Sequence, residues 1–138
     1  MPDIEYNKKT ILNKIQKAHK ISNFSNLPTP KLIAVSKKQN DDKIDEAIKL
    51  GQKFFGENRV QEAQQRWETR LEIHKDIELR LIGPLQTNKI KQALNLFDII
   101  ETIDREKLAK EISKNLNNSS ITKNFYIQVN TGSEPQKS

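Results

Sequence analysis

A lysine directly after an apolar segment is the first residue in this sequence that suggests chemistry. Residues 31–36 read Lys-Leu-Ile-Ala-Val-Ser, which predicts a buried strand, and Lys37 follows them. In parallel α/β folds, ligand sites lie just beyond the carboxyl ends of the strands. A lysine at such a rim is partly desolvated, which favours the neutral amine that can attack an aldehyde. Lys37 is therefore a candidate Schiff-base lysine.

Polar residues follow the other predicted strands in the same way: Glu57 and Asn58, the segment 84–86, Glu101 and Thr102, and Asn130. Each has a structural alternative. Lysine is abundant in this chain, and Lys38 adjoins Lys37. Glu57 and Asn58 are an acid and an N-cap residue, which a helix start favours. The segment 83–89 is either a turn into a capped helix or a set of donors for a phosphate. The residues alone leave these alternatives open.

The elements that would position these residues alternate along the chain. Five apolar segments predict strands, at residues 31–36, 53–56, 79–83, 96–100 and 125–129. All but the last lead into a helical stretch, with Asn40, Asn58, Thr87 and Asp104 as the predicted N-caps. Strand–helix alternation predicts a parallel sheet. We expect one α/β domain over residues 1–138, as an open flavodoxin-like sheet or as part of a (β/α)8 barrel, which takes ~250 residues when complete.

The N-terminal region carries the whole net charge of +6, because residues 1–40 contain eight Lys and two acids. Within residues 1–24, one face of a predicted amphipathic helix is formed by Ile4, Ile11, Ile15 and Ala18. We expect this face to pack and the lysine face to be solvated. The alternative is a basic nucleic-acid or anionic-surface binding module that uses Lys8, Lys9, Lys14, Lys17 and Lys20. Nucleic acid is the less favoured partner, since base contacts favour Arg and aromatic residues, and this segment offers only Tyr6.

Several classes of function are excluded by composition. The chain has no Cys, so it has no disulfide framework and no thiolate metal site, and two His argue against a zinc centre. Four Gly are too few for a Walker or dinucleotide-binding loop. No apolar stretch approaches the roughly 20 residues that span a bilayer, and the N-terminus lacks the core of a signal peptide. We therefore expect a soluble, cytoplasmic protein without a bound metal.

Several short motifs resemble, in order and spacing, those of the pyridoxal phosphate homeostasis proteins. They are Ala34-Val35-Ser36-Lys37, Phe55-Gly56-Glu57-Asn58-Arg59-Val60-Gln61-Glu62, Leu81-Ile82-Gly83-Pro84-Leu85-Gln86-Thr87-Asn88-Lys89, Thr102-Ile103-Asp104 and Gln128-Val129-Asn130. The resemblance runs from about Lys31 to the C-terminus. It implies a partial (β/α)8 TIM-type barrel similar to the N-terminal domain of alanine racemase, with about five of the eight strands present.

The resemblance also implies a site and a role. By the matching Val-Ser-Lys motif, Lys37 would hold pyridoxal 5′-phosphate (PLP) as an aldimine, and Asn58 matches a residue of the family's pocket. The implied role is non-catalytic and lies in intracellular PLP homeostasis, with PLP-dependent apoenzymes as recipients of the cofactor. A racemase-type activity would need a second acid–base residue opposite Lys37, and no candidate is evident.

The sequence departs from the family's pattern in two respects. The family usually has His at the position of Arg80 and often Tyr at that of Arg59, and both replacements are cationic. Family members also continue past the segment that resembles residues 128–138, with about three more of the barrel's eight units and the loops that hold the phosphate. We therefore expect an incomplete barrel that either is completed by a separate C-terminal half or is an inactive fragment.

Overall fold

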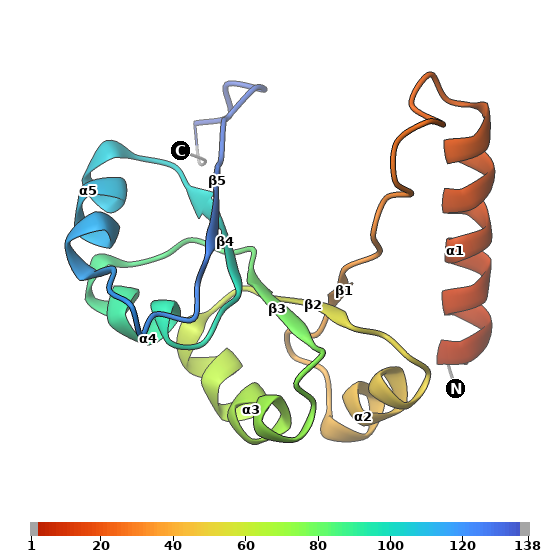
Figure 1. The fold of residues 1–138 in the computed structure, drawn as a ribbon, viewed down its shortest axis with the longest axis horizontal. Coiled ribbons are helices and arrows are strands. Elements are labelled where there is room, and N and C mark those ends of the chain that lie inside the picture. Colours follow the sequence, from red (N-terminus) through yellow and green to blue (C-terminus); the bar gives the residue numbers. More distant parts are fainter. Residues whose placement is uncertain (1–2, 136–138) are drawn as a thin grey trace.

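The computed structural model describes residues 3–135, in which strands and helices alternate from the first strand onwards (Figure 1). The strands are β1 (Ala34–Val35), β2 (Phe54–Glu57), β3 (Glu78–Leu81), β4 (Ile99–Ile103) and β5 (Asn124–Ile127). The helices are α1 (Ile4–Ile21), α2 (Asp41–Lys49), α3 (Val60–Ile73), the short 3₁₀ helix η1 (Thr87–Lys89), α4 (Ile90–Leu94) and α5 (Glu106–Asn115). The predicted alternation is confirmed.

The five strands form one parallel sheet in chain order, β1-β2-β3-β4-β5. A flavodoxin-like sheet has the order 2-1-3-4-5 instead, so the open doubly wound alternative is excluded. Each strand next to its successor is the arrangement of a (β/α)8 barrel. In Figure 1 the sheet curves, and helices α2 to α5 lie along its outer side. The fold is a partial TIM-type barrel, as the resemblance implied.

The core lies between the sheet and these outer helices. The rings of Phe55 on β2 and Trp67 on α3 pack with their centroids 4.6 Å apart, and both side chains are fully buried. Successive strand residues point to opposite faces, so Gly56, between Phe55 and Glu57, lies on the concave face. Arg80 is the register partner of Gly56 and shares that face. The outer face of the sheet therefore carries the core aromatic side chains, and the concave face carries the charge of Arg80.

The two outermost strands are far less buried than predicted. The segment 31–36 yields only the two-residue β1, in which Val35 is 47% exposed, and in β5 Ile127 is 79% exposed. Within residues 3–135, β1 pairs only with β2, and β5 pairs only with β4. The prediction of a buried strand at 31–36 is therefore wrong in its burial, because the second neighbour that would cover it is absent from the described sheet.

Helix α1 forms where the periodicity predicts it, and the Asp3 carboxylate accepts a hydrogen bond from the Tyr6 N–H. No residue of α1 is buried, and the expected packing of its apolar face is only partial: Ile4 and Ile15 are half-buried, whereas Ile11 and Ala18 are exposed. Lys8 donates to the Leu50 carbonyl oxygen at 2.8 Å, at the end of α2, and burial lowers its pKa. This lysine therefore does not belong to a free basic face. No helix in the described part of the chain is both long and apolar enough to cross a membrane.

Of the four predicted N-caps, one is confirmed. Asn40 caps α2, and its side chain accepts from the Lys43 N–H at 3.1 Å. Helix α3 begins two residues after Asn58, with the intervening residue at its N-cap position. Thr87 is the first residue of η1, and Asp104 precedes the N-cap residue of α5. The predictions for these three positions are wrong.

Candidate functional site at the carboxyl ends of the strands

Lys37 lies in the turn that follows β1, and it is exposed. Its amine has no hydrogen-bond or ion-pair partner among residues 3–135. The expected desolvation is not observed, because β1 is an edge strand and only β2 lies beside it. The next residue, Lys38, has a φ of 58°, which turns the chain sharply away from the strand. The Lys37 amine is thus accessible to a ligand from solvent.

Asn58 lies at the neighbouring strand end, in a position equivalent to that of Lys37. Val35 pairs with Gly56 in the register of β1 and β2, and Lys37 and Asn58 each follow that pair by two residues. Asn58 is half-buried and, as described above, does not cap α3. The alternative interpretation of Asn58 as the N-cap of α3 is therefore excluded. Its side-chain amide remains available to a ligand.

A close contact between two loops fixes the backbone of Asn58. A Cβ atom added to Gly83, after β3, would overlap the carbonyl oxygen of Asn58 and lie 2.7 Å from its Cα. Because backbone atoms cannot yield as a flexible side chain can, only glycine fits at this position. The loops after β2 and β3 are therefore packed directly on each other. This contact fixes Asn58 at the end of the central strand β2.

Glu57 does not face the rim of the barrel, contrary to the expectation that it lies with the other polar residues at the strand ends. Its carboxylate is fully buried on the helix side of the sheet. It accepts hydrogen bonds from the Ser36 hydroxyl, from Arg66 Nη1 at 2.7 Å and from Trp67 Nε1 at 3.0 Å. Sequence reasoning did not identify Arg66 and Trp67 as its partners. The available signal was the Trp itself, since a buried indole N–H needs an acceptor.

Arg80 organises the concave face of the sheet. It is 7% exposed, and its Nε donates to Glu78 while its Nη1 donates to Glu101, both at 2.7 Å. Its charge is therefore balanced by two carboxylates. Glu101, which we expected among the ligand-binding residues, is engaged in this cluster, and Thr102 beside it is buried. The cationic replacement at position 80 forms part of an internal ion cluster.

A cavity of about 500 Å³ lies beside Asn58, between the ends of β2 and β3. Its lining comes from the two segments that follow these strands: Asn58, Arg59, Val60, Gln61, Pro84, Gln86 and Lys89. The structure thus brings the predicted segment 84–86 together with Asn58, whereas Lys37 does not line this cavity. Asn130 is involved in its own loop, where its side-chain amide donates to the Glu134 carbonyl at 2.7 Å.

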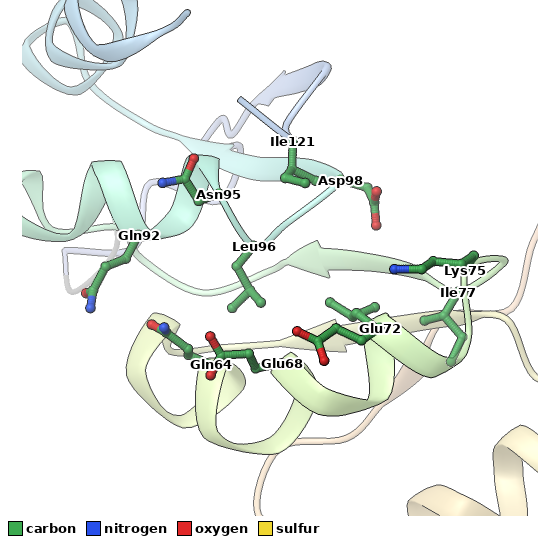
Figure 2. A pocket seen from close by; sticks show the side chains of 11 residues that line it. Gln64, Glu68, Glu72, Lys75, Ile77, Gln92, Asn95, Leu96, Asp98 and Ile121 are labelled. Carbon is green, nitrogen blue, oxygen red and sulfur yellow. The ribbon is translucent and has the colours of Figure 1, made fainter. Parts of the chain in front are cut away.

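A second cavity, of about 530 Å³, lies at the opposite ends of the strands (Figure 2). It is bounded by α3, α4 and the residues that precede β3 and β4, among them Asp98. Burial raises the pKa of Asp98, and its carboxylate accepts from the Leu79 N–H at 2.8 Å. Since none of the predicted site residues lines this cavity, it is separate from the candidate site.

The chain is similar in sequence to proteins that carry one name. Over 137 residues, which is 99% of this chain, the chain is 40% identical to a protein named pyridoxal phosphate homeostasis protein from Buchnera aphidicola subsp. Schizaphis graminum. Over nearly its whole length, the chain is similar to proteins of this name. It spans 59% of the length of that curated relative. No protein-family model matches the chain.

Solved structures with a similar fold agree with the sequence comparison. PipY of Synechococcus elongatus without PLP superposes with a TM-score of 0.67 at 32% identity, over 81% of this chain and 46% of PipY. PipY with PLP bound superposes with a TM-score of 0.58 at 37% identity, over 70% of this chain and 46% of PipY. The resemblance of the motifs to pyridoxal phosphate homeostasis proteins is confirmed, and the partial barrel matches about half of a family member's fold.

Proposed function

We propose that this chain binds PLP covalently through the Lys37 amine and takes part in intracellular PLP homeostasis. The observation that carries the proposal is an accessible lysine amine, without a partner among the described residues, at the end of the first strand of a partial barrel. A primary amine at that place can attack the aldehyde of PLP. A family relative, PipY, has been solved with PLP bound, which supports the same ligand here.

The residues around Lys37 fit such a ligand. Asn58 offers a half-buried amide at the neighbouring strand end, and its backbone is fixed by the contact with Gly83. An amide can donate to and accept from the polar substituents of a pyridine ring. In this proposal Asn58 binds and orients PLP, while Lys37 forms the covalent bond.

We further propose that the chain is a carrier and not a catalyst. The relatives are named homeostasis proteins, which supports a non-catalytic role. PLP-dependent apoenzymes would receive the cofactor. A racemisation of amino acids that disappears in Lys37→Ala would contradict the non-catalytic role.

The test is site-specific labelling. The protein is incubated with PLP, the adduct is reduced with borohydride, and the labelled peptides are mapped by mass spectrometry. We expect one dominant label on Lys37. Lys37→Arg should abolish it, whereas Lys38→Arg, which changes the adjacent lysine in the same turn, should retain it. Label that is scattered over surface lysines, with no preference for Lys37, would contradict the proposal.

We also propose that the single domain formed by residues 1–138 binds PLP most tightly when a second polypeptide supplies further strands. The motivation is the two strands with an unpaired edge in the described sheet, β1 and β5, and the exposed apolar side chains Val35 and Ile127 on them. Such edges are templates for strand pairing. A peptide that corresponds to the unmatched part of the Buchnera relative should then bind this chain and increase the Lys37 label. No binding in either order of mixing would contradict this part of the proposal.

A further inference from the structure

We propose that Ser36 and Glu57 are positioning residues that hold the Lys37 turn in the orientation PLP requires. The inference rests on the proposed function, since it concerns the same lysine. It assigns a role to a buried carboxylate that does not face the ligand side of the strands. The contact that carries it is the hydrogen bond from the Ser36 hydroxyl to Glu57.

The strand that carries Lys37 has few other restraints. β1 comprises two residues and pairs with β2 alone in the described sheet. After Val35, the Ser36 N–H donates to the Gly56 carbonyl at 3.0 Å, and the chain then leaves the sheet. The Ser36 carbonyl accepts from the Gln39 N–H at 3.1 Å, which closes the turn around Lys37. Ser36 is thus the point at which the Lys37 turn is attached to the sheet.

Glu57 connects that point to the rigid part of the molecule. Its two carboxylate oxygens accept from three donors, of which one is on the Lys37 segment and two are on α3. A buried charge is tolerated only where such partners compensate for the lost hydration. Trp67, one of the α3 donors, packs on Phe55 in the centre of the core. Through Glu57, the turn of an edge strand is therefore anchored to the core.

Because Ser36 and Glu57 are buried, they can act on a ligand only through the position of Lys37. Ser36 is 3% exposed and Glu57 is fully buried, so neither can contact a ligand that approaches from solvent. Ser36 is the last residue before the turn, so fixing its side chain toward the helices fixes the point from which the Lys37 turn begins.

The test compares the labelling of two adjacent lysines in one molecule. Wild type and Ser36→Ala are incubated with PLP and reduced, and the ratio of label on Lys37 to label on Lys38 is measured. Because the loss of one hydrogen bond to a charged acceptor is the change made, we expect the ratio to fall about tenfold. The pH midpoint of the absorbance of the lysine–PLP adduct should shift as well. Glu57→Gln, which keeps the size of the side chain, should lower the ratio in the same direction.

A matched control separates positioning from stability. Thr122 is 2% exposed, and its hydroxyl donates to the Phe97 carbonyl at 2.6 Å, so Thr122→Val also removes a buried hydrogen bond. That site lies on the β4–β5 side of the sheet, and we expect its variant to melt at a lower temperature with an unchanged labelling ratio. Ser36→Thr retains the hydroxyl and should restore the ratio.

The outcomes distinguish PLP binding by Lys37 from the positioning role of Ser36 and Glu57. If wild type prefers Lys37 and both Ser36→Ala and Glu57→Gln keep that preference, the positioning role is wrong while PLP binding by Lys37 stands. If wild type itself shows no preference for Lys37, the proposed function fails first. A ratio that falls equally in Thr122→Val would assign the effect to general destabilisation and would also overturn the inference.

Discussion

The central strands β2 and β3 differ from the outer strands β1 and β5 in burial far more than in composition. Phe55 and Leu79, on the central strands, are 1% and 0% exposed, whereas Val35 and Ile127, on the outer strands, are 47% and 79% exposed. All four are apolar residues in parallel strands. The difference has two sources: each outer strand has a single strand neighbour in the described sheet, and Val35 pairs with Gly56 on the concave face, whereas Phe55 faces the covering helix α3. Apolar character predicts a strand, and the neighbours determine its burial.

The candidate site spans both regions. Asn58 follows a central strand, and its backbone is fixed by the loop that contains Gly83. Lys37 follows an outer strand and is exposed in a turn. The residue that would bind the cofactor noncovalently is therefore held by the core, whereas the residue that would react depends on the Ser36–Glu57 hydrogen bond for its connection to the core.

The largest expected difference in stability between the two regions comes from truncating one aromatic side chain in each. Trp67 is fully buried between α3 and β2, and Tyr126 on β5 is 48% exposed. Trp67→Ala should lower the free energy of unfolding by about 4 kcal/mol, because it opens a cavity and removes a donor to Glu57. Tyr126→Ala should lower it by less than about 1 kcal/mol. Urea denaturation followed by circular dichroism measures both values.

Equal losses in the two variants would contradict the comparison. They would mean that β5 contributes as much to stability as the centre of the sheet, despite its exposure. A loss near zero for Trp67→Ala, with the denaturant midpoint unchanged, would equally contradict the assignment of the core to the space between the sheet and α3.

Sequence reasoning located the central region well and the outer region less well. The apolar runs around Phe55 and Leu79 predicted β2 and β3, because a short apolar run bounded by turn residues is typical of a strand. The same pattern at 31–36 led to a buried strand, although burial depends on a neighbour that the local sequence does not contain. The order of the strands, which excludes the flavodoxin-like sheet, also depends on long-range pairing.

The site shows the same division between local and long-range information. Lys37 and Asn58 could be named from their places after strands and from the family's motifs, and the structure puts them at adjacent strand ends. Their roles remain predictions. The connection of Ser36 through Glu57 to Trp67 could not be predicted, since it joins residues of three elements whose relative positions the sequence does not specify.

A smaller effect is expected from two glycine substitutions. Gly83 packs against the backbone of Asn58 in the central region, whereas a Cβ at Gly132, beyond β5, would find its nearest neighbour 3.6 Å away. Gly83→Ala should therefore cost about 2 kcal/mol of stability, as overpacking against a rigid neighbour does. Gly132→Ala should change stability by less than about 0.5 kcal/mol. Thermal unfolding gives both values.

Labelling adds a second measurement to this pair. If Asn58 orients PLP, Gly83→Ala should also reduce the yield of the Lys37 adduct, because the displaced loop moves the amide. Gly132→Ala should leave the yield unchanged. A destabilised Gly83→Ala protein that still labels fully at a temperature where it is folded would remove Asn58 from the proposed site.

The smallest expected effect is on the pH dependence of stability, and it concerns two acids. Asp98 lies directly before β4, and Asp45 lies on the surface of α2. Burial raises the pKa of Asp98 in the folded state above its ordinary value of 3.8. At a pH between the pKa of the unfolded state and that of the folded state, the folded protein therefore keeps a proton that the unfolded chain has released. The contribution of Asp98 to stability therefore falls as pH rises through that window. Asp45 behaves in the opposite way, since its hydrogen bond to Arg70 lowers its pKa below 3.8. Its contribution is present above pH 3.8 and is lost as pH falls through the folded pKa.

The two signs can be separated by replacing each acid with its amide. The free energy of unfolding of Asp98→Asn, minus that of wild type, should increase as pH rises from below 3.8 into the window above it, because wild type alone must bury the ionised carboxylate. For Asp45→Asn the same difference should decrease with rising pH, and only slightly, since the Asp45 side chain is 59% exposed and solvent screens the pair. Urea titrations at a series of pH values measure both differences. Slopes of the same sign for the two variants would contradict the view that the inner strand ends and the helix surface impose opposite environments on a carboxylate.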